Sequence, residues 1–428
     1  MKSAMLVTVG VGPTVADGIA FAIRSAHPNF VLFLVTAESE SKTLPEVVSK
    51  AGIAEGEYAC RRILGENDVE RCALDCAEAI RHLVRREYAP EEIVADFTSG
   101  TKAMSAGLVA AGLEQEVGQL SYVHGERGES GRVVSGTERS ERLKPNRLMA
   151  RRDLRRAIDL FNALRYDTCI DVLQGATRRT ALPQIREQAG ALKRLSEAYR
   201  AWDRFDHKTA LDILVGLTGE PNLAEWGLKK QVERHKAFLY RLLKEKYTQD
   251  RAVDLWNNAE RRAGEGRFDD ATARLYRLLE YIAQVKLCRE HRGLETGNLD
   301  VNNLPEGLRE AYGKPSGRSG RVELGLVEAY GLLRDLEDPV GGRFMEDFEA
   351  SDGPKGVLGL RNNSILAHGF GPVGEPGYGR ACALVRRYLD VAFEGWGKKA
   401  TEAEFPNLKI FIGASDHQRC AGGHRDRP

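Results

Sequence analysis

Arg361, Asn362 and His368 are the residues of this chain whose types and spacing best suit chemistry on a phosphate group. A guanidinium binds an anionic phosphodiester through several donors, while an imidazole that titrates near neutral pH can carry the proton of a ribose hydroxyl or of a leaving oxygen. Seven positions are about two helical turns, so we expect Arg361 and His368 to share one face of a single helix. This arrangement is typical of a site that acts on a nucleic-acid backbone.

The spacing by itself is not specific, because a chain with nine His and many Arg produces coincidences. Arg200 and His207 have the same spacing, but their surroundings are bulky, aromatic and charged. Arg419 and His424 lie in a glycine-rich tail, which is a poor helix former. A purely structural role also fits Arg361 and His368, as a solvated arginine and a histidine that caps a helix end. The elements around the pair must decide between these interpretations.

Length and composition point to a multidomain intracellular protein. A chain of 428 residues with 42% hydrophobic residues should form two or three domains, each with its own core. The formal net charge of +1 excludes a basic field over the whole protein, so any contact with nucleic acid must be local. Seven Cys, an odd number without regular pairing, favour the reducing cytoplasm. No stretch approaches the length of a membrane span.

A metal site is not predicted. His417, Cys420 and His424 could supply three ligands, but they lie in a polar tail without a fourth. We therefore expect these side chains to be solvated.

The first 140 residues alternate between strand and helix patterns. Short β-rich apolar runs cover residues 5–11, 30–37, 93–97 and 120–123. Helical patterns lie between them, notably over residues 68–87 and 102–114. This alternation predicts an open parallel α/β sheet of the Rossmann type.

Two of these strands end in loops suited to a phosphate-bearing ligand. The first loop contains Gly10, Gly12 and Thr14, and its glycines let a ligand approach the backbone. The second loop leads into a helix N-terminus and consists of Thr98, Ser99, Gly100, Thr101 and Lys102. Neither loop is a standard nucleotide fingerprint, and either could be a tight strand-to-helix turn. Because both would lie at the carboxyl edge of one sheet, we expect anion binding there.

Strand signals nearly vanish after residue 143, so the remainder is predicted to be all-α. Three segments share a turn, an aromatic-Asp pair and a following apolar helix: Tyr166-Asp167, Phe205-Asp206 and Phe268-Asp269. Their uneven spacing indicates a helical scaffold with the aromatic residues as packing groups. Residues 401–428 are expected to form a poorly ordered tail.

Taken together, these features resemble the CARF-HEPN ancillary ribonucleases of type III CRISPR systems. The resemblance rests on the Asp96-Phe97-Thr98-Ser99-Gly100-Thr101-Lys102 strand end and on the Arg361-Asn362 and His368 set. Ser99 replaces the first glycine that the family usually has in this loop. The segment from Gly266 to Glu280 is also similar to the early helices of a HEPN domain. The resemblance covers most of the chain.

The resemblance implies an N-terminal CARF domain (residues 1–142), a helical connecting domain (143–247), a HEPN ribonuclease domain (248–400) and the tail (401–428). A cyclic oligoadenylate would bind a CARF dimer at the two loops and act as an allosteric activator, with no other cofactor. Two HEPN domains of a homodimer would bring both copies of Arg361, Asn362 and His368 together. Single-stranded RNA would be cut by its own 2′-hydroxyl without a metal, leaving a 2′,3′-cyclic phosphate.

Two other functions remain open at this level. The chain could be a non-catalytic nucleotide-sensing regulator whose helical part only docks a partner. It could also be a HEPN-type RNA-cutting toxin with no link to cyclic oligoadenylate. The ring size of the activator, the RNA base preference, any breakdown of the activator by the CARF domain and the role of the central helices do not follow from the residues.

Overall fold

The computed structural model describes residues 2–126, 133–134, 136–179, 182–314, 322–348, 350, 353–366 and 368–409. The chain divides into two compact units. Unit 1 comprises Met1–Arg156 and Val172–Ala189, and unit 2 comprises Ala157–Asp171 and Gly190–Pro428. Each unit is described by itself.

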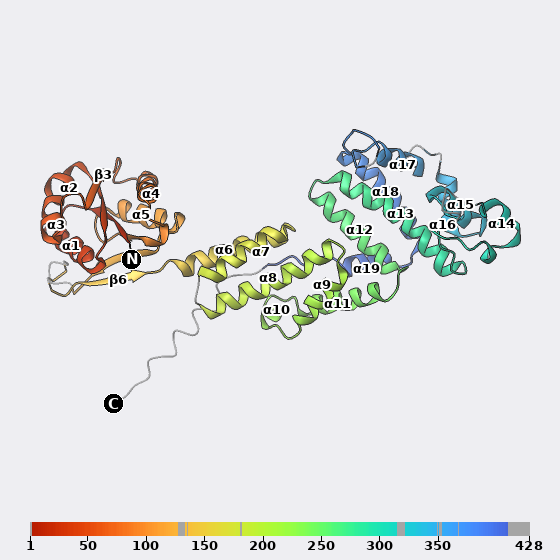
Figure 1. Cartoon of the computed structure of the whole chain (residues 1–428), viewed down its shortest axis with the longest axis horizontal. Coiled ribbons are helices and arrows are strands. Elements are labelled where there is room, and N and C mark those ends of the chain that lie inside the picture. The colour runs from red at the N-terminus through yellow and green to blue at the C-terminus, as the bar shows by residue number, and fades with distance from the viewer. Residues whose placement is uncertain are drawn as a thin grey trace, which may run out of the picture. The chain divides into compact units, whose positions relative to one another are not determined.

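A six-stranded sheet forms the centre of unit 1 (Figure 1). Its strands are β1 (Ala4–Val9), β2 (Phe30–Val35), β3 (Tyr58–Arg62), β4 (Ile93–Asp96), β5 (Gln119–His124) and β6 (Arg139–Leu143). The order is β3-β2-β1-β4-β5-β6, and all neighbours pair in parallel except β5 and β6, which are antiparallel. The strand order reverses between β1 and β4, which is where open α/β sheets bind ligands.

Helices cover both faces of this sheet. They are α1 (Val15–Ala26), α2 (Ala37–Lys42), α3 (Leu44–Ala51), α4 (Val69–Arg85) and α5 (Lys102–Glu114), with a 3-10 turn at Pro90–Glu92. Side chains alternate along β1, so Ala4 and Leu6 pack with α4 and α5 in one core, while Met5 and Val7 pack with α1 and α3 in the other. Both faces are buried, which explains the continuous apolar run of the strand.

The predicted α/β fold is confirmed for this unit, but β3 and β6 were not predicted. Both are edge strands, and most of their side chains are partly or fully exposed. Edge strands of this kind carry polar residues, so their sequences contain no apolar run that would indicate a strand.

The remainder of the described chain is helical, as predicted. Its α-helices are α6 (Asn146–Asn162), α7 (Tyr166–Arg179), α8 (Pro183–Asp203), α9 (His207–Gly216), α10 (Pro221–Glu225), α11 (Lys229–Lys244), α12 (Gln249–Gly264), α13 (Phe268–Glu290), α14 (Glu306–Tyr312), α15 (Leu326–Asp335), α16 (Pro339–Asp347), α17 (Pro354–Asn362), α18 (Glu375–Ala392) and α19 (Trp396–Glu402), with a 3-10 turn at Val301–Asn303. In unit 2, the long helix α13 packs against α12, α15, α17 and α18, so it forms the spine of the C-terminal helices (Figure 1).

The prediction of a poorly ordered tail is wrong for residues 401–409. Leu408 is buried, and it exchanges two hydrogen bonds with the side chain of Asn162 at 2.7 and 3.0 Å. Phe405 packs on Tyr199 and Trp202, with ring centroids 4.8 and 5.0 Å apart. These contacts reach back far along the sequence, so composition could not reveal them. Residues 410–428, including His417, Arg419, Cys420 and His424, lie outside the described residues.

Across the described helices, none combines the length and the apolar character that a membrane crossing requires.

Candidate functional site

Helix α17 ends at Asn362, so Arg361 and His368 do not share a helix. The prediction of one common helix face is therefore wrong. Asn362, Asn363 and Ser364 follow one another at the helix end, and short polar side chains of this kind compete with helical hydrogen bonds. The chain leaves the helix there and forms a compact loop before α18.

Backbone hydrogen bonds nevertheless bring His368 back to the helix end. The N–H of His368 donates to the carbonyl of Asn362 at 3.2 Å, and Ile365 donates to Gly371 at 3.1 Å. Gly369 is required for this turn, since a Cβ added there would lie 1.9 Å from the carbonyl oxygen of Asn363. The loop thus places the backbone of His368 next to Asn362, although the two residues are not related by helical periodicity. His368 and Asn362 are both exposed.

Arg361 is half-buried and held from two sides. Its Nη1 donates to Oδ1 of Asn362 at 3.0 Å, and its guanidinium carbon lies 4.7 Å from the ring centroid of Tyr276 on α13. Stacking on an aromatic face orients a guanidinium while several of its donors stay free for an anion. Burial is the main cause that raises the pKa of Tyr276, and Glu280 adds to it. The ring therefore stays neutral beside the arginine.

Asp269 and Tyr276, two residues of α13, support the loop, and neither was predicted to belong to the site. Oδ1 of Asp269 accepts the backbone N–H of Val373 at 3.0 Å, which fixes the far end of the loop. These partners are about a hundred residues away along the chain, and no local pattern signals them. Only the aromatic-Asp pair that contains Asp269 gave a hint.

Three large apolar side chains of the same loop face solvent. Ile365 and Leu366 are 57% and 55% exposed, and Phe370 is 94% exposed. Surface apolar residues are common singly, but a group within seven residues indicates a contact surface. The group flanks His368 in the sequence.

In unit 1, the two predicted ligand loops meet at the switch point between β1 and β4. The backbone N–H of Gly10 donates to the hydroxyl of Ser99 at 3.0 Å, and the hydroxyl of Thr8 donates to the carbonyl of Ser99. A Cβ on Gly10 would lie 2.7 Å from the nitrogen of Gly100, which itself has a φ of +103°. Both glycines are needed because the loops touch here.

The hydroxyls of the second loop mainly hold the loop together. Thr98 accepts the N–H of Val123 at 2.9 Å, and Thr101 caps α5 by accepting the N–H of Met104 at 3.1 Å. Asp96 is buried and accepts the N–H of Thr98 at 3.1 Å. Its burial raises the pKa of the carboxyl. These contacts position the backbone, so the hydroxyls are less available to a ligand than the sequence suggested.

Gly12, Thr14 and Lys102 are the exposed members of the predicted set. Thr14 precedes α1 without capping it, and Lys102 is the first residue of α5. A cavity of about 220 Å³ lies beside the start of α1, and Thr14, Thr98 and Ser99 line it. The other predicted residues do not. Asp17, Tyr122 and Glu138 also line it, and no signal in the sequence singled them out.

Among the residues that the structure describes, no group of three His, Cys, Asp or Glu side chains is placed to hold a metal ion.

Comparison with known proteins identifies the family. Family models for the Csm6 6H domain and the Csm6 HEPN domain match residues 149–247 and 240–392. A curated relative, the CRISPR system endoribonuclease Csm6 of Thermus thermophilus, is 30% identical over 393 residues, which cover 85% of this chain and 80% of the relative. The chain belongs to the Csm6 family. Its predicted resemblance to the CARF-HEPN ribonucleases is thereby confirmed, as is its enzyme class, an endoribonuclease of a CRISPR system.

A solved Csm6 structure agrees in fold. Csm6 of Enterococcus italicus, bound to cyclic hexa-2'-fluoro-hexa-dAMP, superposes with a TM-score of 0.61 at 14% sequence identity. The match covers 94% of this chain and 99% of the other. At this identity the likeness establishes the Rossmann-like and helical architecture.

Proposed function

We propose that this Csm6 protein cuts single-stranded RNA when a cyclic oligoadenylate binds its N-terminal domain. The N-terminal domain would span residues 1–142, the connecting helices 143–247 and the HEPN domain 248–400. The catalytic part of this proposal rests on the hydrogen bond from the backbone N–H of His368 to the backbone carbonyl of Asn362. This bond brings His368 to the helix end that carries Arg361 and Asn362.

The chemistry uses the substrate's own nucleophile. The 2′-oxygen of a ribose attacks the adjacent phosphorus, the bond from phosphorus to the 5′-oxygen breaks, and a 2′,3′-cyclic phosphate and a 5′-hydroxyl result. Arg361 and Asn362 would stabilise the negative charge that develops on phosphorus, while His368 would transfer the proton to or from the reacting oxygens. A metal-bound water is not needed as nucleophile, so we propose a metal-independent reaction.

A homodimer would complete the site. The exposed side chains of Ile365, Leu366 and Phe370 flank His368 in the sequence, and burial against a second copy would remove them from water. Two-fold symmetry would then bring two sets of Arg361, Asn362 and His368 into one cleft.

The activator would bind at the carboxyl edge of the sheet. The amides at the start of α5, the ammonium of Lys102 and the glycine loop at residues 10–14 provide an anion site at the switch point. The cyclic hexanucleotide analogue held by the Enterococcus protein supports this ligand class. Activation requires that the ring bind one arrangement of the dimer more tightly than another.

One assay tests this proposal. RNA cleavage is measured without activator and with cyclic oligoadenylates of each ring size. We expect one ring to raise the rate strongly. A rate that no ring changes would overturn the proposed activation, whereas the absence of any RNA cleavage would overturn the whole proposal.

A further inference from the structure

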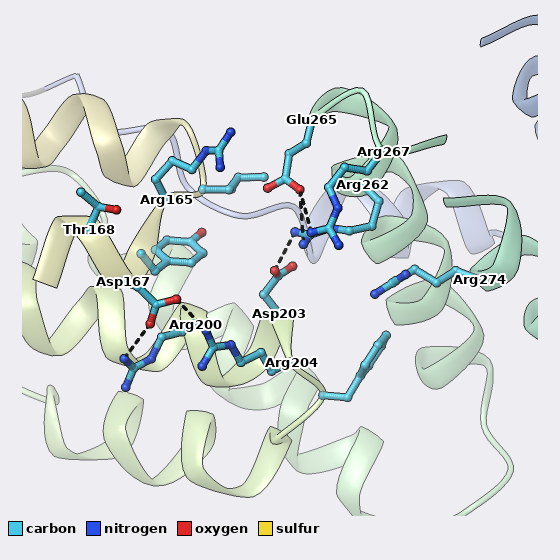
Figure 2. A pocket seen from close by; sticks show the side chains of 13 residues that line it. Arg165, Asp167, Thr168, Arg200, Asp203, Arg204, Arg262, Glu265, Arg267 and Arg274 are labelled. Atoms are coloured by element: carbon cyan, nitrogen blue, oxygen red, sulfur yellow. Dashed lines mark hydrogen bonds and ion pairs between the residues drawn. The ribbon is translucent and has the colours of Figure 1, made fainter. Parts of the chain in front are cut away.

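A second cavity, of about 560 Å³, lies within unit 2 among the turns that join α6 to α7, α8 to α9 and α12 to α13 (Figure 2). Arginines dominate its wall: Arg165, Arg200, Arg204, Arg262, Arg267 and Arg274. The candidate catalytic residues do not line it. This arginine cavity is therefore separate from the candidate catalytic loop.

The three turns around the arginine cavity have one backbone geometry. Leu164, Phe205 and Gly266 adopt left-handed conformations with φ of 60°, 63° and 72°. In each turn the following N–H donates to the carbonyl five residues earlier, at 2.8 to 2.9 Å. This is the hydrogen-bond pattern of a Schellman helix end. The three aromatic-Asp segments noted in the sequence start at these turns, so the repeated pattern corresponds to three corners that converge on one cavity.

Each corner contributes an arginine next to its left-handed residue: Arg165, Arg204 and Arg267. Two non-glycine residues in left-handed conformations are uncommon and cost free energy. Phe205 remains 37% exposed beside Arg204, whereas Tyr166 at the first corner is buried. The packing role predicted for the aromatics therefore holds for Tyr166 but not fully for Phe205.

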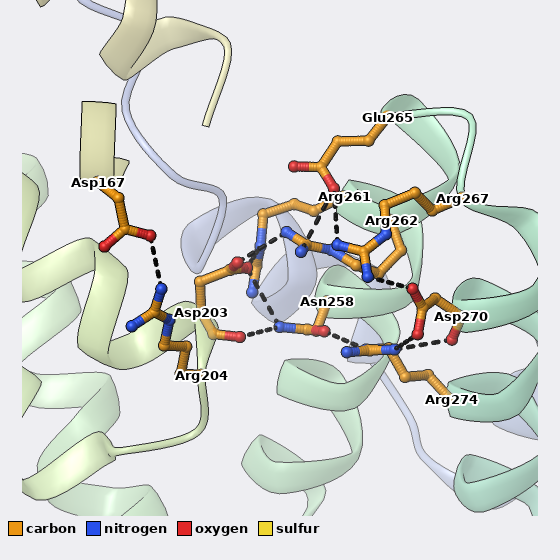
Figure 3. Close-up of polar contacts among 10 residues, drawn as sticks. All are labelled: Asp167, Asp203, Arg204, Asn258, Arg261, Arg262, Glu265, Arg267, Asp270 and Arg274. Carbon is orange, nitrogen blue, oxygen red and sulfur yellow. Dashed lines mark hydrogen bonds and ion pairs between the residues drawn. The ribbon is translucent and has the colours of Figure 1, made fainter. Parts of the chain in front are cut away.

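Every carboxylate of the cluster is shared by two arginines (Figure 2 and Figure 3). Asp167 pairs with Arg200 at 3.1 Å and with Arg204 at 2.6 Å. Asp203 pairs with Arg261 at 2.8 Å and with Arg262 at 2.7 Å. Each guanidinium has five N–H groups, so two arginines that share one carboxylate still have N–H donors that this carboxylate does not bind.

The same sharing continues at the third corner. Glu265 lies 3.3 Å from Arg262 and 3.7 Å from Arg267, while Asp270 pairs with both Arg267 and Arg274. Arg165 has no ion pair with any described carboxylate, and Figure 2 shows it at the edge of the arginine cavity without a partner. With Arg165, the cluster contains seven arginines but four carboxylates, which leaves a positive surplus.

The interior of the cluster also contains an unpaired donor. Nε of Arg262 is buried without a hydrogen-bond partner among the described residues, and the residue is 8% exposed. Burial is the main cause that lowers the pKa of Arg274, Asp270 opposes this effect, and Arg262 adds to it. Both observations describe guanidiniums that a bound anion would stabilise.

We propose that the arginine cavity binds phosphodiester groups of the single-stranded RNA substrate, outside the catalytic loop. This inference rests on the proposed ribonuclease function. Arginines fit phosphate oxygens through two donors at once, and the partly exposed ring of Phe205 lines the cavity with them. A basic surface with an adjacent stacking side chain is the combination that binds single-stranded nucleic acid.

Helix α13 connects this site with the candidate catalytic loop. Arg274 lines the arginine cavity, and Tyr276, two residues later, stacks with Arg361. Residues two apart point to different sides of a helix, so a bound strand must pass around α13, whose diameter with side chains is about 10–12 Å. Several nucleotides are needed for that path. The cavity should therefore increase the affinity for long RNA but not the affinity for di- or trinucleotides.

The test compares two double variants of the full-length protein. Arg165→Gln with Arg204→Gln removes two cavity charges while Asp167 keeps its pair with Arg200. Lys230→Gln with Arg234→Gln is the control, because it removes the same charge from exposed positions of α11 that do not line the cavity.

The probe is a long single-stranded 2′-O-methyl RNA, which lacks the nucleophile and cannot be cut. We expect the cavity variant to bind it roughly tenfold more weakly, with a salt slope reduced by about 1.4 for two lost phosphate contacts. The control should keep the wild-type slope. Asp167→Asn, which releases Arg200 and Arg204 from their ion pairs, should strengthen binding, an effect that damage to the fold would not produce.

Equal affinity and slope in the cavity and control variants would overturn the proposal. So would binding of inorganic phosphate at the arginine cavity without binding of RNA. Neither result bears on RNA cleavage by the wild-type protein, so the ribonuclease function is tested independently by the cleavage assay. Since the probe is not cut, the cavity is tested even if the catalytic assignment fails.

Discussion

His368 donates its backbone N–H to the carbonyl oxygen of Asn362 at 3.2 Å. This bond, rather than a shared helix face, ties the imidazole to the end of α17. The loop that it closes is also fixed to α13 through Asp269 and Val373 at 3.0 Å. The candidate catalytic residues are therefore held by contacts from two directions.

Replacing either Arg361 or His368 with alanine should abolish RNA cleavage. Loss of one member of a cooperating catalytic set commonly costs a hundredfold or more in rate. Cleavage is measured at saturating activator, with dimerisation and activator binding as controls that should be unchanged. Arg343→Ala, which removes a surface arginine paired with Asp347, should keep full activity. Retained cleavage in both site variants would disprove the assignment.

Cleavage should persist in excess chelator, because the nucleophile is the 2′-hydroxyl of the RNA. The upstream product should carry a 2′,3′-cyclic phosphate and the downstream product a 5′-hydroxyl. End-group analysis by mass spectrometry decides this. An absolute need for a divalent ion together with a downstream 5′-phosphate would indicate a different mechanism.

Lys102→Ala should weaken activator binding and leave the chemistry intact. The ammonium stands at the N-terminus of α5, where it adds to the amides that face a phosphate. Cleavage should therefore recover at high activator concentration, and the titration midpoint should shift. Lys42→Ala, on the surface of α2, is the matched control. A Lys102 variant activated at the wild-type concentration would remove this residue from the ligand site.

Phe370→Ser should weaken the homodimer and, with it, RNA cleavage. The side chain is 94% exposed, and its burial against a second copy is worth about 1.5–3 kcal/mol, or roughly tenfold or more in the dissociation constant. Sedimentation measures the dimer. Tyr240→Ser, at a comparably large exposed side chain on α11, should change neither property. An unchanged dimer in the Phe370 variant would place the interface elsewhere.

The stability of unit 2 should fall on acidification because of His235. The side chain is fully buried against Tyr199, whose hydroxyl lies 2.7 Å from its Nδ1. Burial, and next the charge of Arg234, lowers its pKa to about 4. The unfolded chain takes up a proton below about pH 6.5, while the folded one does so only near pH 4.

Acidification between these values should therefore cost up to about 3 kcal/mol of unfolding free energy. Urea unfolding at several pH values measures it, and the difference between wild type and His235→Gln cancels the contributions of other groups. A difference that does not change with pH would contradict the assignment.

Several features were predictable from local pattern. The buried strands β1, β2, β4 and β5 appear as apolar runs, and α4 and α5 as regular periodicity between them, so the α/β unit follows from short-range signals. The residue types of Arg361, Asn362 and His368 and the strand-end loop at residues 98–102 were sufficient to indicate the family. Chemistry of this kind depends on residue type, which the sequence states directly.

Tertiary contacts decided the rest. The support of Arg361 by Tyr276 and the anchoring of Leu408 by Asn162 both join residues far apart in the chain. The three arginine-bearing corners could be recognised as a repeat, but their convergence on one cavity could not. Periodicity describes which face of an element is buried, whereas the partner that buries it is selected only when the whole chain packs.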